Sequence, residues 1–240
     1  INGLLQQAAV SARELCYALL PIGTGNDWIR THGIPRNWEQ TLKMIQAGHT
    51  LLHDIGQVEY QTDTGSKKHY FINVAGMAYD AFLVRYIEEK NPKGLSKAYY
   101  FSMILRCLFM YRLKRARVWF DGQEEAAKFY TINVGVCKYS GGGMQFVPHA
   151  DPTSGRLALT LVHAVSKLGV LLATPYFYEG RIRRHRKVTL HEVQEVRVEH
   201  VNPKEPVLVE VDGEFLGQTP VRYSLLPGAL RVVVPKPLAD

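Results

Sequence analysis

The sequence has few of the features that identify several protein classes. Its three cysteines, Cys16, Cys107 and Cys137, lie far apart without a C-x-x-C pair, so their spacing indicates neither a disulfide framework nor a zinc site. No apolar run reaches the ~18 residues of a membrane-spanning helix, and the nine histidines show no H-E-x-x-H or comparable metal spacing. No signal peptide, repeat or low-complexity tract is visible. These absences predict a cytoplasmic globular protein.

The composition allows a sizeable core and an anionic partner. The chain has 240 residues, of which 46% are hydrophobic and 21% charged, which is enough for one large domain or two small ones. Its formal net charge of +7 suits a nucleotide, a phospholipid surface or a nucleic acid. No nucleic-acid-binding motif accompanies that charge, so nucleic acid is not expected as a partner.

The order of predicted elements divides the chain near residue 50. Before it, an apolar strand over 14–21, a glycine-rich turn and two helices, one capped by Asn37 and ended by Gly48, are typical of an α/β unit. After it, strands dominate, with helices predicted over 79–89, 95–113 and 166–180, the second of them buried on most sides. The strands are predicted over 54–60, 68–74, 115–121, 127–136, 156–163, 187–201, 206–211, 220–224 and 230–234. The predicted fold class is α/β plus β: an α/β remnant (1–50) and a mainly antiparallel β-sandwich-like domain with helices (51–240), whose last residues return to the first part.

Residues 21–27, Pro-Ile-Gly-Thr-Gly-Asn-Asp, form the first candidate site. Glycines between a strand and a helix let backbone N–H groups face an anion, and Thr24 and Asn26 add short polar side chains. Asp27 could approach a metal or hold the turn. An ordinary strand-to-helix loop, with Asp27 as the helix N-cap, explains the same residues and is slightly favoured.

Residues 209–215, Val-Glu-Val-Asp-Gly-Glu-Phe, form the second. Asp-Gly between alternating strands predicts a plain hairpin, as it does at Asp121-Gly122. The alternative is that Glu214, held on a rigid turn, accepts a proton from a substrate hydroxyl during phosphoryl transfer. The local sequence does not separate the two.

Three further segments carry candidate residues. Asp80 begins a predicted helix after a strand, so it is either an N-cap or a carboxylate that binds a substrate hydroxyl. The three glycines within residues 139–144 allow close backbone approach or form a flexible loop. Basic residues at 112–117 and 181–187 form a solvated face or a surface that attracts anionic lipid.

Five motifs, in order along nearly the whole chain, resemble the diacylglycerol kinase catalytic-domain family of lipid kinases, which includes the sphingosine kinases. Residues 21–27 with the following Gly-Ile-Pro resemble its P-L-G-T-G-N-D…G-I-P segment, and Asp54 its strand entry D-h-G. Residues 71–81 are similar to F-x-N-x-x-G-x-G-x-D-A, residues 139–144 to Y-x-G-G-G-M, and residues 212–214 to D-G-E. Each motif alone is weak, whereas five in order are specific.

The resemblance implies a two-domain kinase with ATP and Mg²⁺ as cofactors and its active site between the domains. It implies that Glu214 is the proton acceptor with Asp212 beside it, that Asp80 approaches the lipid head group, and that nucleotide-binding positions include Asn2, Gly23, Thr24, Gly25, Asn26 and Asp27. The family's structural magnesium site has an Asp where Ser154 stands here, which leaves Asp151 as a substitute ligand. Ala78 replaces a frequent Gly, and Val136 a common Asn.

The resemblance also suggests that Ile1-Asn2 ends a Gly-Gly-Asp-Gly-Thr phosphate loop, so we expect a family member without its first ~90 residues and with little activity as it stands. The expected function is ATP-dependent phosphorylation of a lipid hydroxyl, of diacylglycerol or a related long-chain lipid, by a peripheral protein at an anionic membrane. An NAD kinase-like enzyme and a non-catalytic lipid- or nucleotide-binding module are the alternatives. A homodimer is left open.

Overall fold

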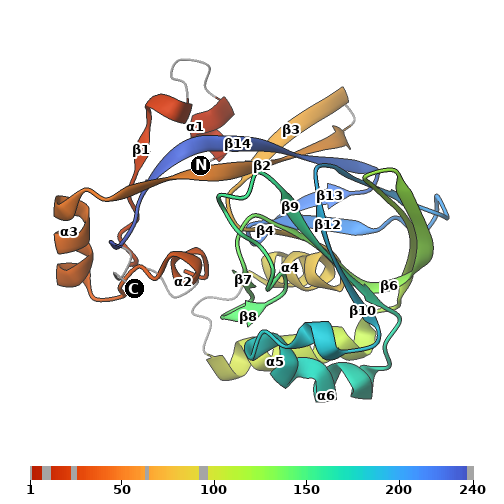
Figure 1. Ribbon diagram of the computed structural model, residues 1–240. Helices are drawn as coiled ribbons and strands as arrows, with labels where there is room; N and C mark the ends of the chain where they lie inside the picture. The colour runs from red at the N-terminus through yellow and green to blue at the C-terminus, as the bar shows by residue number, and fades with distance from the viewer. Residues whose placement is uncertain (1, 7–11, 23–25, 63–64, 92–96, 237–240) are drawn as a thin grey trace.

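The computed structural model describes residues 2–6, 12–22, 26–62, 65–91 and 97–236. Within these ranges most strands join one large, mainly antiparallel sheet that curls into a sandwich-like body, with the helices at its ends and along one side (Figure 1). This confirms the predicted β-rich class. No helix in the described part of the chain has the length and apolarity needed to cross a bilayer.

Two long strands, β2 (Thr50–Thr62) and β14 (Val221–Val233), pair antiparallel along the length of the molecule (Figure 1). At one end β14 also pairs in parallel with β1 (Cys16–Tyr17), so the last strand meets the first part of the chain. The path through the sheet is β13-β12-β4-β6-β5-β11-β14-β2-β3, and β9 joins β6 and β10. The remaining strands are β3 (Gly65–Phe71), β4 (Val74–Ala78), β5 (Lys114–Phe120), β6 (Gln123–Gly135), β7 (Tyr139–Ser140), β8 (Met144–Gln145), β9 (Leu157–His163), β10 (Val188–Val193), β11 (Val196–His200), β12 (Leu208–Val211) and β13 (Glu214–Gln218).

The helices lie at the ends of this sheet, except the fourth in the chain, which packs along strands β4, β12 and β13 (Figure 1). In chain order they are α1 (Asn2–Gln6), α2 (Trp28–His32), α3 (Trp38–Ala47), α4 (Tyr79–Lys90), α5 (Lys97–Met110) and α6 (Lys167–Tyr178), with short 3-10 helices at Ala12–Glu14 and Ile182–Arg184. The main core fills the sandwich with side chains such as Phe71, Ile132 and Tyr223. A second cluster packs Trp28, Ile29 and Met44 of α2 and α3 against the end of β14. Burial of these apolar faces stabilises the arrangement.

The predicted helix ends in the first 50 residues are confirmed. The Asn37 side chain accepts a hydrogen bond from the N–H of Gln40, as an N-cap does, and Gly48 ends α3 in the left-handed conformation at φ 69°. Gly33 ends α2 in the same way at φ 64°. These signals are local, which explains why the sequence predicted them.

Several predicted strands are wrong in extent. Residues 187–201 form two strands, because the chain leaves β9 after Val193 and joins β5 and β14 from Val196. Conversely, 220–224 and 230–234 belong to the single strand β14, whose register shifts between Leu226 and Leu230. The segment 14–21 is a two-residue strand with alternating, partly exposed side chains, not a buried strand.

The prediction that the helix over 95–113 is buried on most sides is also wrong. Tyr99, Phe101, Phe109 and Met110 of α5 are between 46% and 61% exposed. Among the α5 side chains that the structure describes, Met103, Cys107 and Leu108 are the fully buried ones. An apolar helix with one buried stripe leaves an unusual amount of apolar surface in water.

Ala78 has a backbone conformation that normally requires glycine. It precedes α4 at φ 69° and ψ −111°, outside the regions that side chains with a Cβ favour. We expect Ala78→Gly to raise stability by about 1 kcal/mol, which is roughly 2–4 °C in Tm for a chain of this size. Thermal unfolding measures this. Ala75→Gly on the same strand is the control, because Ala75 has no positive φ, and it should lower Tm. An equal fall in both variants would contradict the strain argument.

Candidate functional site

The turn between β12 and β13 is fixed to the segment that joins β3 and β4. Asp212 is the first turn residue, at φ 51°, and Gly213 follows at φ 88°, as in a two-residue hairpin. The Asp212 carboxylate accepts three backbone hydrogen bonds, each 3.1 Å long, from Ile72, Asn73 and Val74. Its own N–H donates to the carbonyl of Val74. Asp212 is therefore a positioning residue that orients the turn, and its carboxylate oxygens are already engaged.

The same segment also holds the start of the described chain. The Asn2 side-chain oxygen accepts a hydrogen bond from the N–H of Tyr70 at 3.0 Å. Gln6 adds a bond from its amide to the carbonyl of Lys68. Tyr70 and Ile72 are two extended residues apart, about 7 Å. Asn2 and the β12–β13 turn, both predicted as site residues, therefore lie close together.

Glu214 begins β13 on the exposed side of this turn. Among the described residues no hydrogen bond or ion pair to its carboxylate is found, in contrast to Asp212. The N–H of the next residue, Phe215, donates to Glu88 of α4 at 2.9 Å, which fixes the strand direction. A cavity of about 380 Å³ lies beside β13 and is lined by Phe215, Arg85, Glu88 and neighbouring residues, but Glu214 is not among its lining residues. The geometry leaves Glu214 free to meet a substrate.

A second acidic group lies on the inner side, where β4 passes into α4. Thr131 donates to a carboxylate oxygen of Asp80, and Asn133 donates to the hydroxyl of Thr131 at 3.0 Å. Glu210 on β12 is almost fully buried and accepts the N–H of Gly213 at 2.8 Å. Gly76 separates the two acids: a Cβ there would lie 2.3 Å from a Glu210 oxygen and 3.0 Å from the Asp80 Cβ. The two carboxylates thus lie close together beneath the turn, on either side of Gly76.

Both acids hold their protons more tightly than usual. Burial raises the pKa of Asp80 to about 6, although hydrogen bonds from Thr131 and Asn133 oppose the shift. Burial, with the neighbouring carboxylates of Asp80 and Asp212, raises the pKa of Glu210 well above its usual range. Sequence reasoning named Asp80 but missed Glu210. The available signal was an acid inside the otherwise apolar strand Leu208–Val211.

The raised pKa of Asp80 predicts a pH-dependent stability. Between about pH 4 and pH 6 the folded protein keeps a proton that the unfolded chain has lost, so stability falls as the pH rises through this window. Asp80→Asn removes this loss. We expect the variant to gain up to about 3 kcal/mol over the wild type at pH 8 and little at pH 4. Urea unfolding at both pH values measures it. Glu39→Gln, on the exposed surface of α3, should show no such difference; equal gains at both pH values would contradict the assignment.

Asp27 connects the first predicted motif with the glycine loop. Its carboxylate accepts the N–H of Gly142 at 2.6 Å and the Nε–H of Arg30 at 3.2 Å. It makes no side-chain N-cap bond to α2, so its role is to hold the loop. At Gly143 the φ of 104° is strained for any residue with a Cβ, which would also lie 3.1 Å from the Arg30 guanidinium carbon. Gly23, Thr24 and Gly25 lie outside the described residues, and Asn26 is half-buried beside Asp27.

The loop at 151–156 fits a protein-built magnesium site poorly. Asp54, almost fully buried, accepts the N–H groups of Gly155 and Gly228, each at 2.7 Å, with both of its oxygens. One oxygen of Asp151 caps Thr153. Mg²⁺ is usually held by one or two carboxylates together with waters or phosphates. Within the described residues, the second Asp151 oxygen is the one carboxylate oxygen of this loop without a hydrogen bond, so we derive no step from a metal here.

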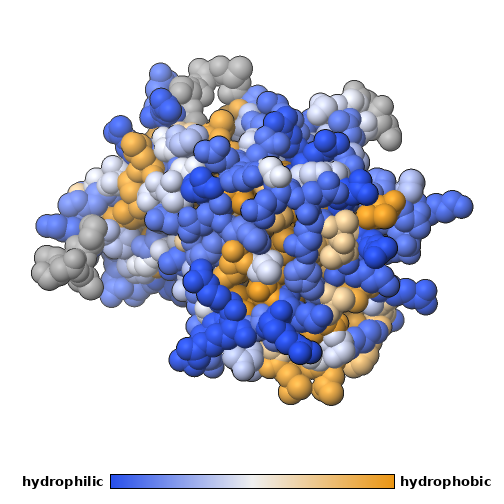
Figure 2. Space-filling view, turned by 45° about the vertical axis from the view of Figure 1, so that its right-hand side comes forward, coloured by the Kyte–Doolittle hydropathy of each residue, from blue (hydrophilic) through white to orange (hydrophobic). Residues whose placement is uncertain are grey.

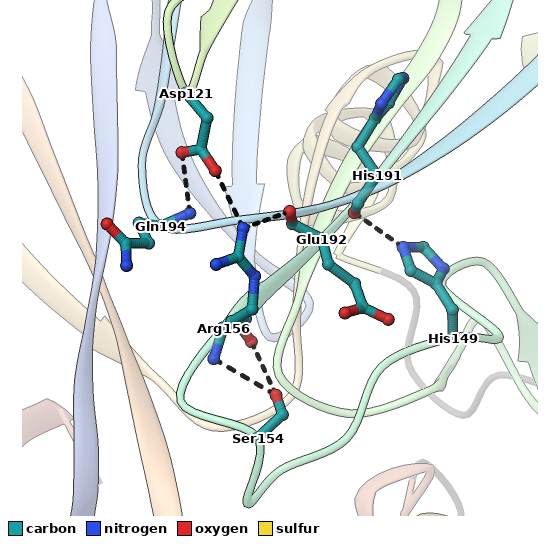
Figure 3. A network of polar contacts seen from close by, with 7 residues as sticks. All are labelled: Asp121, His149, Ser154, Arg156, His191, Glu192 and Gln194. Carbon is teal, nitrogen blue, oxygen red and sulfur yellow. Dashed lines mark hydrogen bonds and ion pairs between the residues drawn. The ribbon is translucent and has the colours of Figure 1, made fainter.

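The same loop carries the positively charged side chain of Arg156 (Figure 3). The Arg156 guanidinium donates to Asp121 at 3.0 Å and to the carbonyl of Glu192 at 2.7 Å, while Ser154 accepts the N–H of Arg156. Gln194 donates its N–H to the other Asp121 oxygen. The two Asp-Gly hairpins thus have the same backbone conformation, but the hydrogen-bond partners of Asp121 and Asp212 differ.

Comparison with known proteins agrees with this geometry. The family described as "YegS C-terminal NAD kinase beta sandwich-like domain" matches residues 73–234, and "Diacylglycerol kinase catalytic domain" matches residues 1–58. A protein named "Diacylglycerol kinase" from Mycobacterium tuberculosis is 29% identical over 98% of this chain and 75% of its own length. A Yersinia enterocolitica protein named "Probable lipid kinase YegS-like" is 26% identical over 90% of this chain and 69% of its own.

Solved structures share the fold. A crystal structure of a diacylglycerol kinase from Bacillus anthracis str. Sterne has a TM-score of 0.62 at 20% identity, over 92% of this chain and 66% of its own. A second structure from the same organism reaches 0.69 at 22% identity, over 94% of this chain and 72% of its own. The sandwich and its strand connections are therefore a known arrangement.

Proposed function

Because the chain belongs to the diacylglycerol kinase catalytic-domain family, we propose that it serves an ATP- and Mg²⁺-dependent transfer of phosphate to a lipid hydroxyl, with diacylglycerol or a related long-chain alcohol as acceptor. In this proposal Glu214 takes the hydroxyl proton, and Asp212 only orients the turn. Bound Mg²⁺ would neutralise phosphate charge. Asp80 would receive the head group from the inner side of the turn.

One observation carries the proposal most directly. Asn2 and Asp212 both accept backbone hydrogen bonds from the same segment, Asn2 from Tyr70 and Asp212 from residues 72–74. The first described residues therefore lie beside the turn that bears Glu214. Phosphoryl transfer requires a nucleotide phosphate and a proton acceptor held on one rigid frame. The Asp27–Gly142 bond supports the frame from the side of the predicted phosphate turn.

The acceptor decides between the proposal and its alternatives. Radiolabelled ATP with Mg²⁺ is offered with diacylglycerol in mixed micelles and, separately, with NAD. We expect label in the lipid and none in NAD, even where the total turnover of the 240-residue chain is low. Label in NAD alone would overturn the lipid assignment. Liposome binding with label in neither acceptor would favour a non-catalytic module.

Helices α5 and α6 supply the surface through which we propose that the protein meets the membrane. They lie side by side, and Lys167 of α6 donates to the carbonyl of Phe109 of α5. Figure 2 shows hydrophobic residues gathered along this lower edge, with hydrophilic ones beside them. The exposed apolar side chains are Tyr99, Phe101, Phe109, Met110, Leu168, Leu171, Leu172, Tyr176 and Tyr178.

Basic side chains beside the apolar face of α5 and α6 favour an anionic partner. Arg106, Lys167, Arg183 and Arg184 are exposed on α5, on α6 and on the 3-10 helix beyond them. Ile182 of that 3-10 helix packs with Phe177, which places the arginines beside the apolar face. Aromatic side chains surrounded by basic ones suit an anionic bilayer, where each cation contributes about 1 kcal/mol. An anionic bilayer is therefore the partner that we propose.

Substitutions on this face test the membrane surface. Phe109→Asp and Leu172→Asp should each lower binding to vesicles that contain phosphatidylglycerol at least tenfold, because about 1.5–3 kcal/mol of apolar burial is lost with each side chain. Co-sedimentation measures the bound fraction. Trp38→Ser, on α3 at the far end of the molecule, is 60% exposed in the wild type and should leave binding unchanged. A different result would contradict the membrane surface: both Asp variants bind vesicles like the wild type, but the wild type forms a dimer and the variants do not. This face would then be an interface between two copies of the chain.

A further inference from the structure

Three potential metal ligands meet where α2 packs on the sheet. They are His32 at the end of α2, His53 on β2, and Cys137 after β6. Their ligand atoms all lie within 4.8 Å of one another. His53 and Cys137 are fully buried and His32 is partly exposed. Spacing rules predicted no metal site at these cysteines, because the three residues are distant in sequence and only the fold brings them together.

The distances agree with a tetrahedral site of the zinc type. The Cys137 sulfur lies 3.4 Å from Nε2 of His53 and 3.8 Å from Nε2 of His32. Zinc bonds of about 2.3 Å to sulfur and 2.0–2.1 Å to nitrogen, at tetrahedral angles, place sulfur and nitrogen about 3.5 Å apart. The two sulfur–nitrogen distances therefore already match a zinc site, whereas the histidine nitrogens, which lie within 4.8 Å of each other, would move to the ~3.3 Å separation of tetrahedral ligands.

The hydrogen bonds around His53 orient its ring for this role. Its Nδ1 makes a short contact with the carbonyl oxygen of Asp54, so Nδ1 carries the proton and Nε2 keeps its lone pair. A ligating histidine is typically held by such a bond to its other nitrogen. The indole N–H of Trp28 donates to the same Nε2 at 3.3 Å and would have to release it when a metal binds.

We propose that His32, His53 and Cys137 bind a divalent transition-metal ion of the zinc class, with water or a small ligand in the fourth position. The site is independent of the proposed kinase chemistry. Two imidazoles and a thiolate favour zinc over Mg²⁺ or Ca²⁺, which take oxygen ligands. Cys137 loses its proton on binding, and the thiolate balances one charge of the ion. Among the described residues no fourth His, Cys, Asp or Glu joins the group.

The ion would fasten α2 to the sheet from two sides. His32 belongs to α2, whose Arg30 and preceding Asp27 hold the Gly142–Gly143 loop, whereas His53 and Cys137 belong to the sheet and the start of that loop. The main-chain N–H of Lys138 already donates to the hydroxyl of Thr31. Metal binding would therefore stabilise α2 and the glycine loop together.

Metal content tests the proposal without any assay of catalysis. The purified chain is stripped with EDTA, incubated with Zn²⁺ and Mg²⁺ together, desalted and analysed by mass spectrometry. We expect about one zinc per chain. The extended X-ray absorption fine structure of the bound zinc should show one sulfur at about 2.3 Å and two nitrogens at about 2.0 Å. The Tm should be several degrees higher with zinc than without it. Co²⁺ bound in place of zinc should give a thiolate-to-metal charge-transfer band in the absorption spectrum. This band shows thiolate coordination in the wild type alone, without any variant.

Variants identify the ligands. Cys137→Ser and His53→Gln should lose the zinc and the cobalt band, while Cys107→Ser and Cys16→Ser, at the other two thiols, should keep both. If Cys137→Ser does not fold, the cobalt band of the Cys107→Ser/Cys16→Ser double variant still assigns the thiolate to Cys137. Absence of zinc and of the band in the wild type, or retention of both after Cys137→Ser, would overturn the proposal and leave a hydrogen-bonded core cluster.

Discussion

Replacement of Glu214 by Gln is expected to lower turnover of ATP with a lipid acceptor by about 10²–10⁴-fold, the usual contribution of a positioned general base. Gln keeps the size of the side chain but does not accept the hydroxyl proton. Because Glu214 is exposed and, among the described residues, its carboxylate makes only a long-range electrostatic interaction with His69, the fold should not change. The measurements are kcat with diacylglycerol, ATP affinity and Tm, and only kcat should fall.

The second Asp-Gly hairpin provides a control carboxylate, Glu124, which differs from Glu214 in being paired with Arg117 and Trp119. Glu124 lies on the strand after Asp121-Gly122 and is also exposed. Glu124→Gln should retain full activity. Glu210→Gln tests the rival acid beneath the turn. Near-normal turnover in Glu214→Gln, with a collapse in Glu210→Gln, would assign the base to the buried carboxylate instead.

Loss of the Asp212 carboxylate is expected to destabilise the protein strongly. Asp212→Ala leaves three backbone N–H groups of residues 72–74 without their acceptor. The expected cost is about 3 kcal/mol in the free energy of unfolding, or roughly 6–12 °C in Tm. Turnover should fall as well, because the turn that carries Glu214 is no longer oriented. Thermal and urea unfolding measure the stability.

Asp121→Ala separates this effect from backbone strain. Both aspartates stand at the same turn position, at φ 42° and 51°, so alanine is strained equally in each. Asp121 accepts one backbone N–H and one exposed guanidinium group, and its loss should cost about 1 kcal/mol. Equal destabilisation of the two variants would show that the three N–H bonds do not matter.

The sequence predicted the features whose causes are local. Asn37 and Gly48 cap α3 with their immediate neighbours, and both Asp-Gly pairs form hairpins because few residues adopt positive φ there. The order of motifs also predicted the family. Sequence alone did not distinguish the two hairpins, since the partners of Asp212 are some 140 residues away.

The remaining features depend on tertiary contacts. No breaker residue marks the change of partner between β10 and β11, so 187–201 was predicted as one strand. Burial of Glu210 follows from its place opposite Gly76, and exposure of α5 from the absence of a covering element within the described ranges. The predicted boundary near residue 50 and the nucleotide role of residues 23–25 stay predictions.

A structure of the protein with Mg²⁺ and a non-hydrolysable ATP analogue tests the central claim most directly. We expect the terminal phosphate beside Asn2 and the 70–74 segment, with the Glu214 carboxylate facing it. A nucleotide bound instead in the cavity of about 510 Å³ lined by Arg197, Arg222 and Glu59 would contradict it.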